Sequence, residues 1–88
     1  MDEEIKKNVI AYIASCANLP TAAIKDEYIL RDHPLQLDNE KLGSLALALR
    51  AYVKSLNPEE TVLATELRGA GMNVKKTCEL IFKKVSHL

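Results

Sequence analysis

Apolar residues recur at helical spacing along the middle of the chain and predict a helix from about residue 39 to residue 56. Read at about 100° per residue, six side chains fall on one narrow face, as in a helix that packs against a core. These side chains are Leu42, Leu45, Leu49, Tyr52, Val53 and Leu56. Asp38 is suited to accept hydrogen bonds from the N–H groups of the first turn, and Asn57-Pro58 cannot continue the helix. We expect the rest of the chain to pack around this central helix.

The same periodicity predicts a helix near each end of the chain. The first covers residues 3–17, with Asp2 as its cap and Asn18 just beyond its end. Its apolar stripe consists of Ile5, Val9, Ile13 and Cys16. The last helix covers residues 74–87. Its stripe, which follows the capping residue Asn73, consists of Val74, Cys78, Ile81, Val85 and Leu88.

The segments between these helices differ in length and pattern. Residues 18–37 are irregular, with one short turn predicted at residues 21–24 and enough apolar side chains to hold the connection against the helices. Asn57-Pro58-Glu59-Glu60 has the capping side chain, first-turn proline and glutamate of a helix start, so a short third helix is predicted to begin there. We expect Gly69-Ala70-Gly71 to end it by supplying a residue in the left-handed conformation. The chain is therefore predicted to form an all-α, four-helix bundle, as one domain over residues 1–88, with a long first loop.

The composition narrows the classes of function. A domain of 88 residues is small for a deep catalytic cleft, so we expect a binding or carrier protein that is not an enzyme and has no catalytic residues. The net charge is zero and aromatic residues are few, which argues against nucleic acid as a partner. Residues 1–40 carry four basic and eight acidic side chains, a net charge of −4, and residues 41–88 carry eight basic and four acidic ones, a net charge of +4. We expect the two halves to attract each other within one fold; the alternative is a basic partner-binding face on the second half.

Cys16 and Cys78 lie far apart in the sequence, and no histidine lies at ligand spacing from them, so no metal site is predicted. Both lie on apolar helix faces, which favours buried, reduced thiols in a cytoplasmic protein; a disulfide between the first and last helices is the alternative. No apolar run reaches the roughly 18 residues that a membrane span requires, and the start Met-Asp-Glu-Glu is unlike a signal peptide.

The segment Leu35-Gln36-Leu37-Asp38-Asn39 resembles the motif Leu-Gly-Leu/Ala-Asp-Ser of the acyl carrier protein family. With the long first loop and the four helices, the resemblance covers nearly the whole chain, at weak identity. It implies a carrier whose 4′-phosphopantetheine arm is attached to a serine at the start of the second helix, and partners such as acyl-transfer or synthase enzymes of lipid or polyketide metabolism. In this register Asn39 occupies the place of the serine. In a second register, Leu42-Gly43-Ser44-Leu45, Ser44 occupies it and Gly43 replaces the aspartate.

Helical phase distinguishes the two registers. Counted from Asn39, the family's core positions are all apolar, whereas counted from Ser44 they include Arg50 and Lys54, whose burial would carry a prohibitive desolvation cost. The apolar set is Leu42, Leu45, Ala46, Leu49 and Val53. The first register therefore places an amide where the modifiable hydroxyl is expected, and leaves Ser44, on the solvent side, as a fallback attachment site.

The exposed side of the central helix is predicted to bind a protein partner. This side is typically acidic in the acyl carrier protein family, but here it offers cations and small apolar side chains, namely Lys41, Leu47, Ala48, Arg50, Ala51 and Lys54. We therefore expect a carrier-like domain that presents its second helix to a partner, either carrying acyl groups on a phosphopantetheine arm or derived from such a carrier. The alternative is a protein–protein interaction or regulatory helical module with no prosthetic group.

Overall fold

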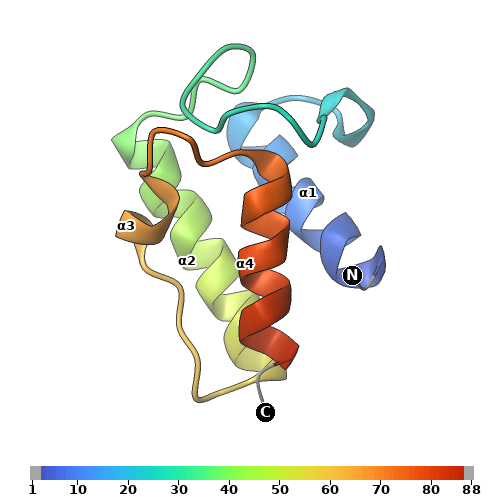
Figure 1. The fold of residues 1–88 in the computed structure, drawn as a ribbon, viewed down its shortest axis with the longest axis vertical. Helices are drawn as coiled ribbons and strands as arrows, with labels where there is room; N and C mark the ends of the chain where they lie inside the picture. Colours follow the sequence, from blue (N-terminus) through green and yellow to red (C-terminus); the bar gives the residue numbers. More distant parts are fainter. Residues whose placement is uncertain (1–2, 87–88) are drawn as a thin grey trace.

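The computed structural model describes residues 3–86 and shows a bundle of four α-helices (Figure 1). The elements are α1 (Glu3–Ala17), the 3₁₀-helix η1 (Thr21–Ala23), α2 (Asn39–Leu56), α3 (Ala64–Leu67) and α4 (Val74–Ser86). Within residues 3–86 there is no β-strand, although an isolated antiparallel bridge pairs Ile29 with Asn73. The predicted all-α, four-helix bundle with a long first loop and a short third helix is confirmed.

The three longer helices enclose the core. α1 packs against both α2 and α4, and α3 packs against α2. In Figure 1, α2 and α4 run in the same direction and α1 runs the opposite way, so the first loop covers the end of the bundle where α1 ends and the other two begin. The predicted stripes are buried at Ile5, Val9, Ile13, Leu42, Leu45, Leu49, Val53, Val74, Cys78, Ile81 and Val85.

Helix α1 ends where the sequence predicts because Asn18 adopts the left-handed conformation, with a φ of 58°. Its N–H donates to the carbonyl oxygen of Ser15 (N to O, 3.3 Å), and the N–H of Leu19 donates to that of Ala14 (3.0 Å). These are the two hydrogen bonds of a Schellman motif, which satisfies the last carbonyl groups of a helix. Asparagine tolerates this conformation better than most residues other than glycine. The predicted cap at the other end, Asp2, lies outside the described residues.

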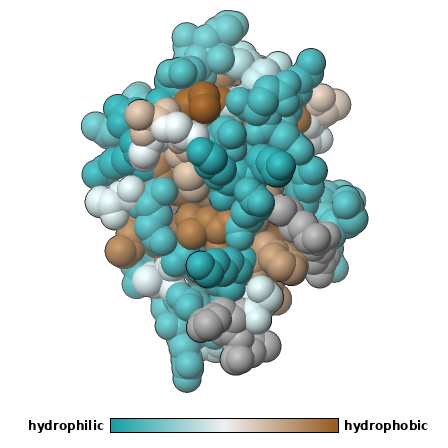
Figure 2. Space-filling view, viewed as in Figure 1, coloured by the Kyte–Doolittle hydropathy of each residue, from teal (hydrophilic) through white to brown (hydrophobic). Residues whose placement is uncertain are grey.

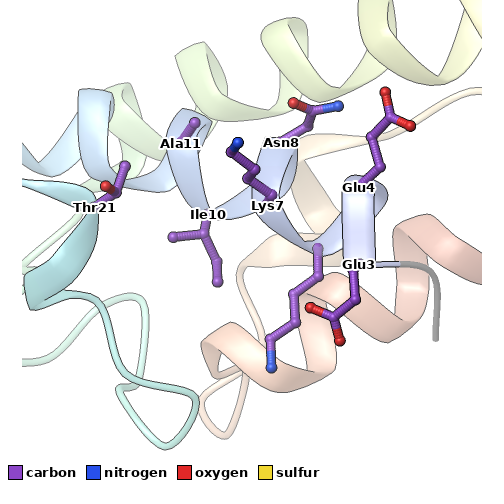
Figure 3. A pocket seen from close by; sticks show the side chains of 8 residues that line it. Glu3, Glu4, Lys7, Asn8, Ile10, Ala11 and Thr21 are labelled. Carbon is purple, nitrogen blue, oxygen red and sulfur yellow. The ribbon is translucent and has the colours of Figure 1, made fainter.

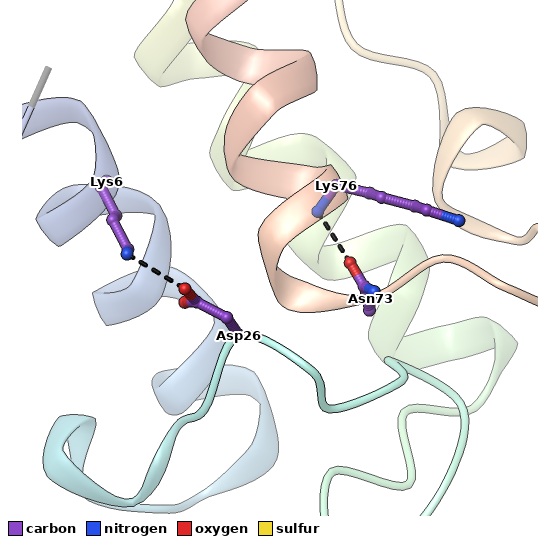
Figure 4. A network of polar contacts seen from close by, with 4 residues as sticks. All are labelled: Lys6, Asp26, Asn73 and Lys76. Carbon is purple, nitrogen blue, oxygen red and sulfur yellow. Dashed lines mark hydrogen bonds and ion pairs between the residues drawn. The ribbon is translucent and has the colours of Figure 1, made fainter. Parts of the chain in front are cut away.

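The first loop is held to the helices by buried side chains and by hydrogen bonds. The N–H of Val74 donates to the carbonyl oxygen of Tyr28 (2.9 Å), and the N–H of Lys75 donates to that of Asp26 (3.0 Å), so the loop satisfies the first turn of α4. The Asp26 carboxylate also pairs with the Lys6 ammonium of α1 (N to O, 3.2 Å; Figure 4). The apolar side chains of this loop that are buried in the core are Ile24, Leu30, Leu35 and Leu37.

Asn73 caps helix α4, as predicted. Its side-chain Oδ1 accepts a hydrogen bond from the N–H of Lys76 (2.8 Å; Figure 4), and its carbonyl oxygen accepts one from the hydroxyl of the buried Thr77 (2.8 Å). The predicted stripe residue Leu88 lies outside the described residues. The observed helix, Val74–Ser86, agrees with the prediction over its described length.

The prediction that a helix begins at Asn57-Pro58 is wrong, because α3 starts only at Ala64. Asn57 instead ends α2 and is 4% exposed, and its side-chain Nδ2 donates to the carbonyl oxygen of Lys84 in α4 (3.0 Å). An amide that joins α2 to α4 inside the protein is not available to cap a helix on the surface. The N–H of Leu63, which precedes α3, is satisfied by Glu66 Oε1 (2.9 Å).

Two further predictions on these segments are wrong. Neither Gly69 nor Gly71 adopts the left-handed conformation, and α3 already ends at Leu67, two residues before the first glycine. The helical periodicity predicts Leu56 on the core face, but its side chain is 48% exposed. It lies in the last turn of α2 and lines a surface depression together with Tyr52.

Both cysteines are free, so the alternative disulfide between the first and last helices is not present. Cys78 is buried, as predicted, whereas Cys16 is only half-buried. Burial raises the pKa of the Cys78 thiol to about 11, and the charge of Asp26 adds to this shift. The Cys78 thiol is therefore protonated at neutral pH.

Candidate functional site

The amino end of α2 carries the first predicted site residue. Asp38 caps the helix, as predicted: its Oδ1 accepts from the N–H of Lys41 (2.8 Å), and its carbonyl oxygen accepts from that of Leu42 (2.8 Å). Asn39 is the first residue of the helix and is exposed. The side chain next to the cap is thus an amide that faces solvent.

The second residue of the segment Leu35-Gln36-Leu37-Asp38-Asn39 has an unusual backbone conformation. Gln36 adopts the left-handed conformation, with a φ of 48°, and its side chain is exposed. Its neighbours Leu35 and Leu37 are both buried, and the N–H of Leu37 donates to the carbonyl oxygen of Leu30 (2.9 Å). The left-handed residue allows the chain to bury both leucines and then turn into α2.

The buried face of α2 is the one predicted from Asn39. All five expected positions are less than 5% exposed, and they are Leu42, Leu45, Ala46, Leu49 and Val53. Arg50 is exposed and Lys54 is half-exposed, so neither lies in the core. Because a register counted from Ser44 would bury both cations, this packing agrees with the register that begins at Asn39.

Ser44 lies in the second turn of α2 and is exposed. It follows Asn39 by five residues, which places the two side chains about 140° apart around the helix. The structure therefore does not bring these two predicted site residues together.

The predicted partner-binding residues form a ridge and a flank. Leu47, the centre of the ridge, is 66% exposed, and Arg50, Ala51 and Lys54 lie within about 60° of it around the helix. Lys41 and Ala48 lie about 100° to 120° away and belong to the flank. Burial raises the pKa of the Cys16 thiol in α1, and the nearby positive charge of Lys41 opposes part of that increase.

The cations of this face do not take part in the ion pairs of the described structure. Within residues 3–86, those ion pairs join Lys6 to Asp26 and Lys84 to Glu66. Each pair lies within one half of the chain, so neither connects the acidic half to the basic half. Among the described residues, the hydrogen-bond acceptor of Lys54 Nζ is a backbone carbonyl, that of Pro58, at 3.5 Å. The positive charges of α2 therefore remain available to a partner.

Two residues of the same ridge were missed by the sequence reasoning. Glu40 and Gly43 also lie within about 60° of Leu47, and the helical phase alone could have placed them there. Glu40 is exposed. A Cβ atom added to Gly43 would meet nothing within 4 Å, so no packing inside this protein requires a glycine at this position.

Other surface features are less organised. A depression beside α1 and η1, shown in Figure 3, contains none of the predicted site residues and is lined by Glu3, Glu4, Lys6, Lys7, Asn8, Ile10, Ala11 and Thr21. Figure 2 shows that hydrophobic surface on the viewed face is confined to small patches among hydrophilic side chains, one of them between α3 and α4. The side chain with the largest exposed fraction among the exposed large hydrophobic residues is Leu47, on the α2 ridge.

Comparison of the chain with protein-family models, with curated proteins and with solved structures gave no significant match. No helix within residues 3–86 is both long and apolar enough to cross a membrane. In the same part of the chain, no three or more His, Cys, Asp and Glu side chains gather in a way that could hold a metal ion.

Proposed function

We propose that this chain is a carrier-derived, non-enzymatic binding domain that presents the outer face of α2 to a protein partner. The observation that supports the proposal is the buried face of α2, which agrees with the register that assigns Asn39 to the place of the attachment serine and which turns Leu47, Arg50 and Lys54 outward. A partner suited to this face offers an acidic side chain to Lys54 and an apolar contact for Leu47.

The backbone of Gln36 supports the proposed descent from acyl carrier proteins. In the register that begins at Asn39, Gln36 occupies the position at which the resembled motif has glycine. Its φ of 48° lies in the left-handed region that favours glycine. Helical phase selects the register. The left-handed backbone at the motif's glycine position is a separate observation that supports the same register.

The residues at the start of α2 do not fit a 4′-phosphopantetheine arm. The arm is attached as a phosphate ester to a hydroxyl, and the Asn39 side chain has none. Ser44 has an exposed hydroxyl but lies a turn further along and about 140° around the helix. We therefore propose that the chain has kept the fold of a carrier and has lost the attachment site.

Attachment of the arm is tested by intact mass after incubation with coenzyme A and a phosphopantetheinyl transferase of broad specificity. We expect the natural sequence and the Ser44→Ala variant to gain no mass, because neither offers a hydroxyl next to Asp38. The Asn39→Ser variant restores the Asp-Ser pair and is expected to gain the mass of one arm.

The variants also separate the competing functions. A gain by the natural sequence that Ser44→Ala abolishes would show a working carrier that uses Ser44, and would overturn the proposal. If Asn39→Ser gains no mass while a known carrier in the same reaction does, the descent from carriers is rejected in favour of an interaction module with no carrier history.

A further inference from the structure

The exposed ridge of α2 is complementary to itself. It has an acidic residue, Glu40, near the amino end and a basic residue, Lys54, near the carboxyl end, and Leu47 lies midway between them, seven residues from each. Gly43 and Ser44 lie on one side of the centre, and Arg50 and Ala51 lie on the other. Both ends of the ridge lie about 10 Å from Leu47 along the helix axis.

We propose that the partner of this face is a second copy of the chain, bound with the two α2 helices antiparallel and a two-fold axis through Leu47. This proposal rests on the proposed function only in that the outer face of α2 is taken as an interaction surface; it does not depend on descent from carriers. In a two-fold interface each residue faces its symmetry counterpart, and for an antiparallel pair of helices this is the residue equally far beyond the centre.

The pairs that follow from this symmetry are favourable in charge and in size. Glu40 faces Lys54 of the second copy, and Gly43 faces its Ala51. Ser44, which also lies about 60° from Leu47 around the helix, faces its Arg50, and the Leu47 side chains meet on the axis. Each pair occurs twice, apart from the one on the axis. A parallel arrangement would place Glu40 against Glu40 and Lys54 against Lys54, so repulsion between like charges selects the antiparallel one.

Gly43 supplies an independent reason for a close contact with another backbone. A glycine inside a helix destabilises it by about 0.5 to 1 kcal/mol relative to alanine. The space around the missing side chain is open, so the fold itself gains nothing from the glycine. A second helix packed over Gly43 would use that space, because small residues allow two helix backbones to approach closely.

The exposed state of the ridge also fits a weak, reversible dimer. Leu47 is 66% exposed in the single chain, and the net charge of zero creates no overall repulsion between copies. One helix per copy forms a small interface, which is typical of transient association. We therefore expect dimers to form in the micromolar to millimolar range.

Sedimentation velocity from about 10 µM to about 1 mM tests the association. We expect the average mass of the natural chain to rise from 9.8 kDa toward twice that value. The Leu47→Asp variant is expected to remain a monomer, whereas Leu63→Asp, which charges an equally large exposed leucine off the ridge, should behave as the natural chain does. Far-UV circular dichroism checks that both variants fold.

Charge reversal tests the orientation. Glu40→Lys and Lys54→Glu should each weaken dimerisation about tenfold, because each creates two like-charge pairs across the axis. The double variant restores opposite charges and should return to within about threefold of the natural chain. If the face bound an unrelated acidic protein instead of a second copy, the double variant would not regain binding.

A natural chain that stays monomeric at 1 mM would overturn the dimer, and a dimer that the double variant fails to restore would overturn the antiparallel arrangement. Both outcomes are distinct from failure of the proposed function, which is decided by the mass of the Asn39→Ser variant. A monomeric chain whose Asn39→Ser variant accepts the arm would retain carrier descent and lose only the second copy as partner.

Discussion

Gln36 shows how one residue links the loop to the candidate site. Its left-handed backbone, with a φ of 48°, allows Leu35 and Leu37 to enter the core immediately before the cap of α2. For residues other than glycine this conformation costs about 1 to 2 kcal/mol. The chain therefore accepts a local energetic cost at a position where glycine would be favoured.

Replacing Gln36 is expected to reveal this cost. Gln36→Gly should raise the free energy of unfolding by about 0.5 to 1 kcal/mol, because relief of the backbone cost exceeds the extra entropy of glycine in the unfolded chain. Gln36→Ala keeps the Cβ atom and should change stability by less than about 0.5 kcal/mol. Urea unfolding followed by circular dichroism measures both, and equal stabilities for the two variants would contradict the argument.

Among the helices, a predicted end agrees with the structure wherever the capping residue interacts only with residues close to it in the sequence. Asn18, Asp38 and Asn73 each end or begin a helix as predicted, because their contacts involve residues only three or four positions away or the backbone next to them. Asn57 differs, since its amide bonds to a carbonyl of α4, 27 residues away. That contact depends on the packing of two helices and has no sequence signal.

The tertiary role of Asn57 predicts the effect of removing its amide. Asn57→Ala should lower the free energy of unfolding by about 1 to 3 kcal/mol, because the carbonyl of Lys84 loses a donor in a buried setting. Asn39→Ala makes the same chemical change at an exposed position and should alter stability by less than about 0.5 kcal/mol. If thermal or urea unfolding gave similar losses for the two, Asn57 would be a surface residue in solution.

Across the molecule, the ion pairs found within residues 3–86 do not join the acidic half of the chain to the basic half. Within the described residues, the acidic half and the basic half each hold their own pair, Lys6 with Asp26 and Lys84 with Glu66. Hydrophobic burial and the hydrogen bonds of the first loop join the parts instead. The unpaired charges of α2 are therefore free for the association proposed above.

The buried Cys78 thiol makes the stability of the whole fold depend on alkaline pH. An unfolded thiol ionises near pH 9, whereas burial raises the pKa of Cys78 in the folded state to about 11, so the unfolded state loses its proton first. Stability is thus unaffected by this group below pH 9 and falls as pH rises toward 11, by about 2 kcal/mol. The raised pKa of Lys6, caused by Asp26, acts in the same direction above pH 10.5.

Unfolding free energies between pH 8 and pH 11 test this dependence. The Cys78→Ala variant should lose less stability than the natural chain over that interval, although it starts from a lower value because a buried atom has been removed. Cys16→Ala removes a half-buried thiol and should retain most of the decrease. Parallel curves for the natural chain and Cys78→Ala would show that the Cys78 thiol does not titrate as argued.

Helices α1, α2 and α4, their buried stripes and most of their caps follow from the order of the residues alone, because a period of 3.6 residues and a capping side chain are local properties. The order of the residues also indicates which side of α2 faces outward, since burial of Arg50 and Lys54 would be too costly. The place of Asn57, the late start of α3, the exposure of Leu56 and the backbone of Gln36 are set by the packing of the whole chain. These features depend on which distant groups meet, and the energy of such contacts appears only when the helices are packed together.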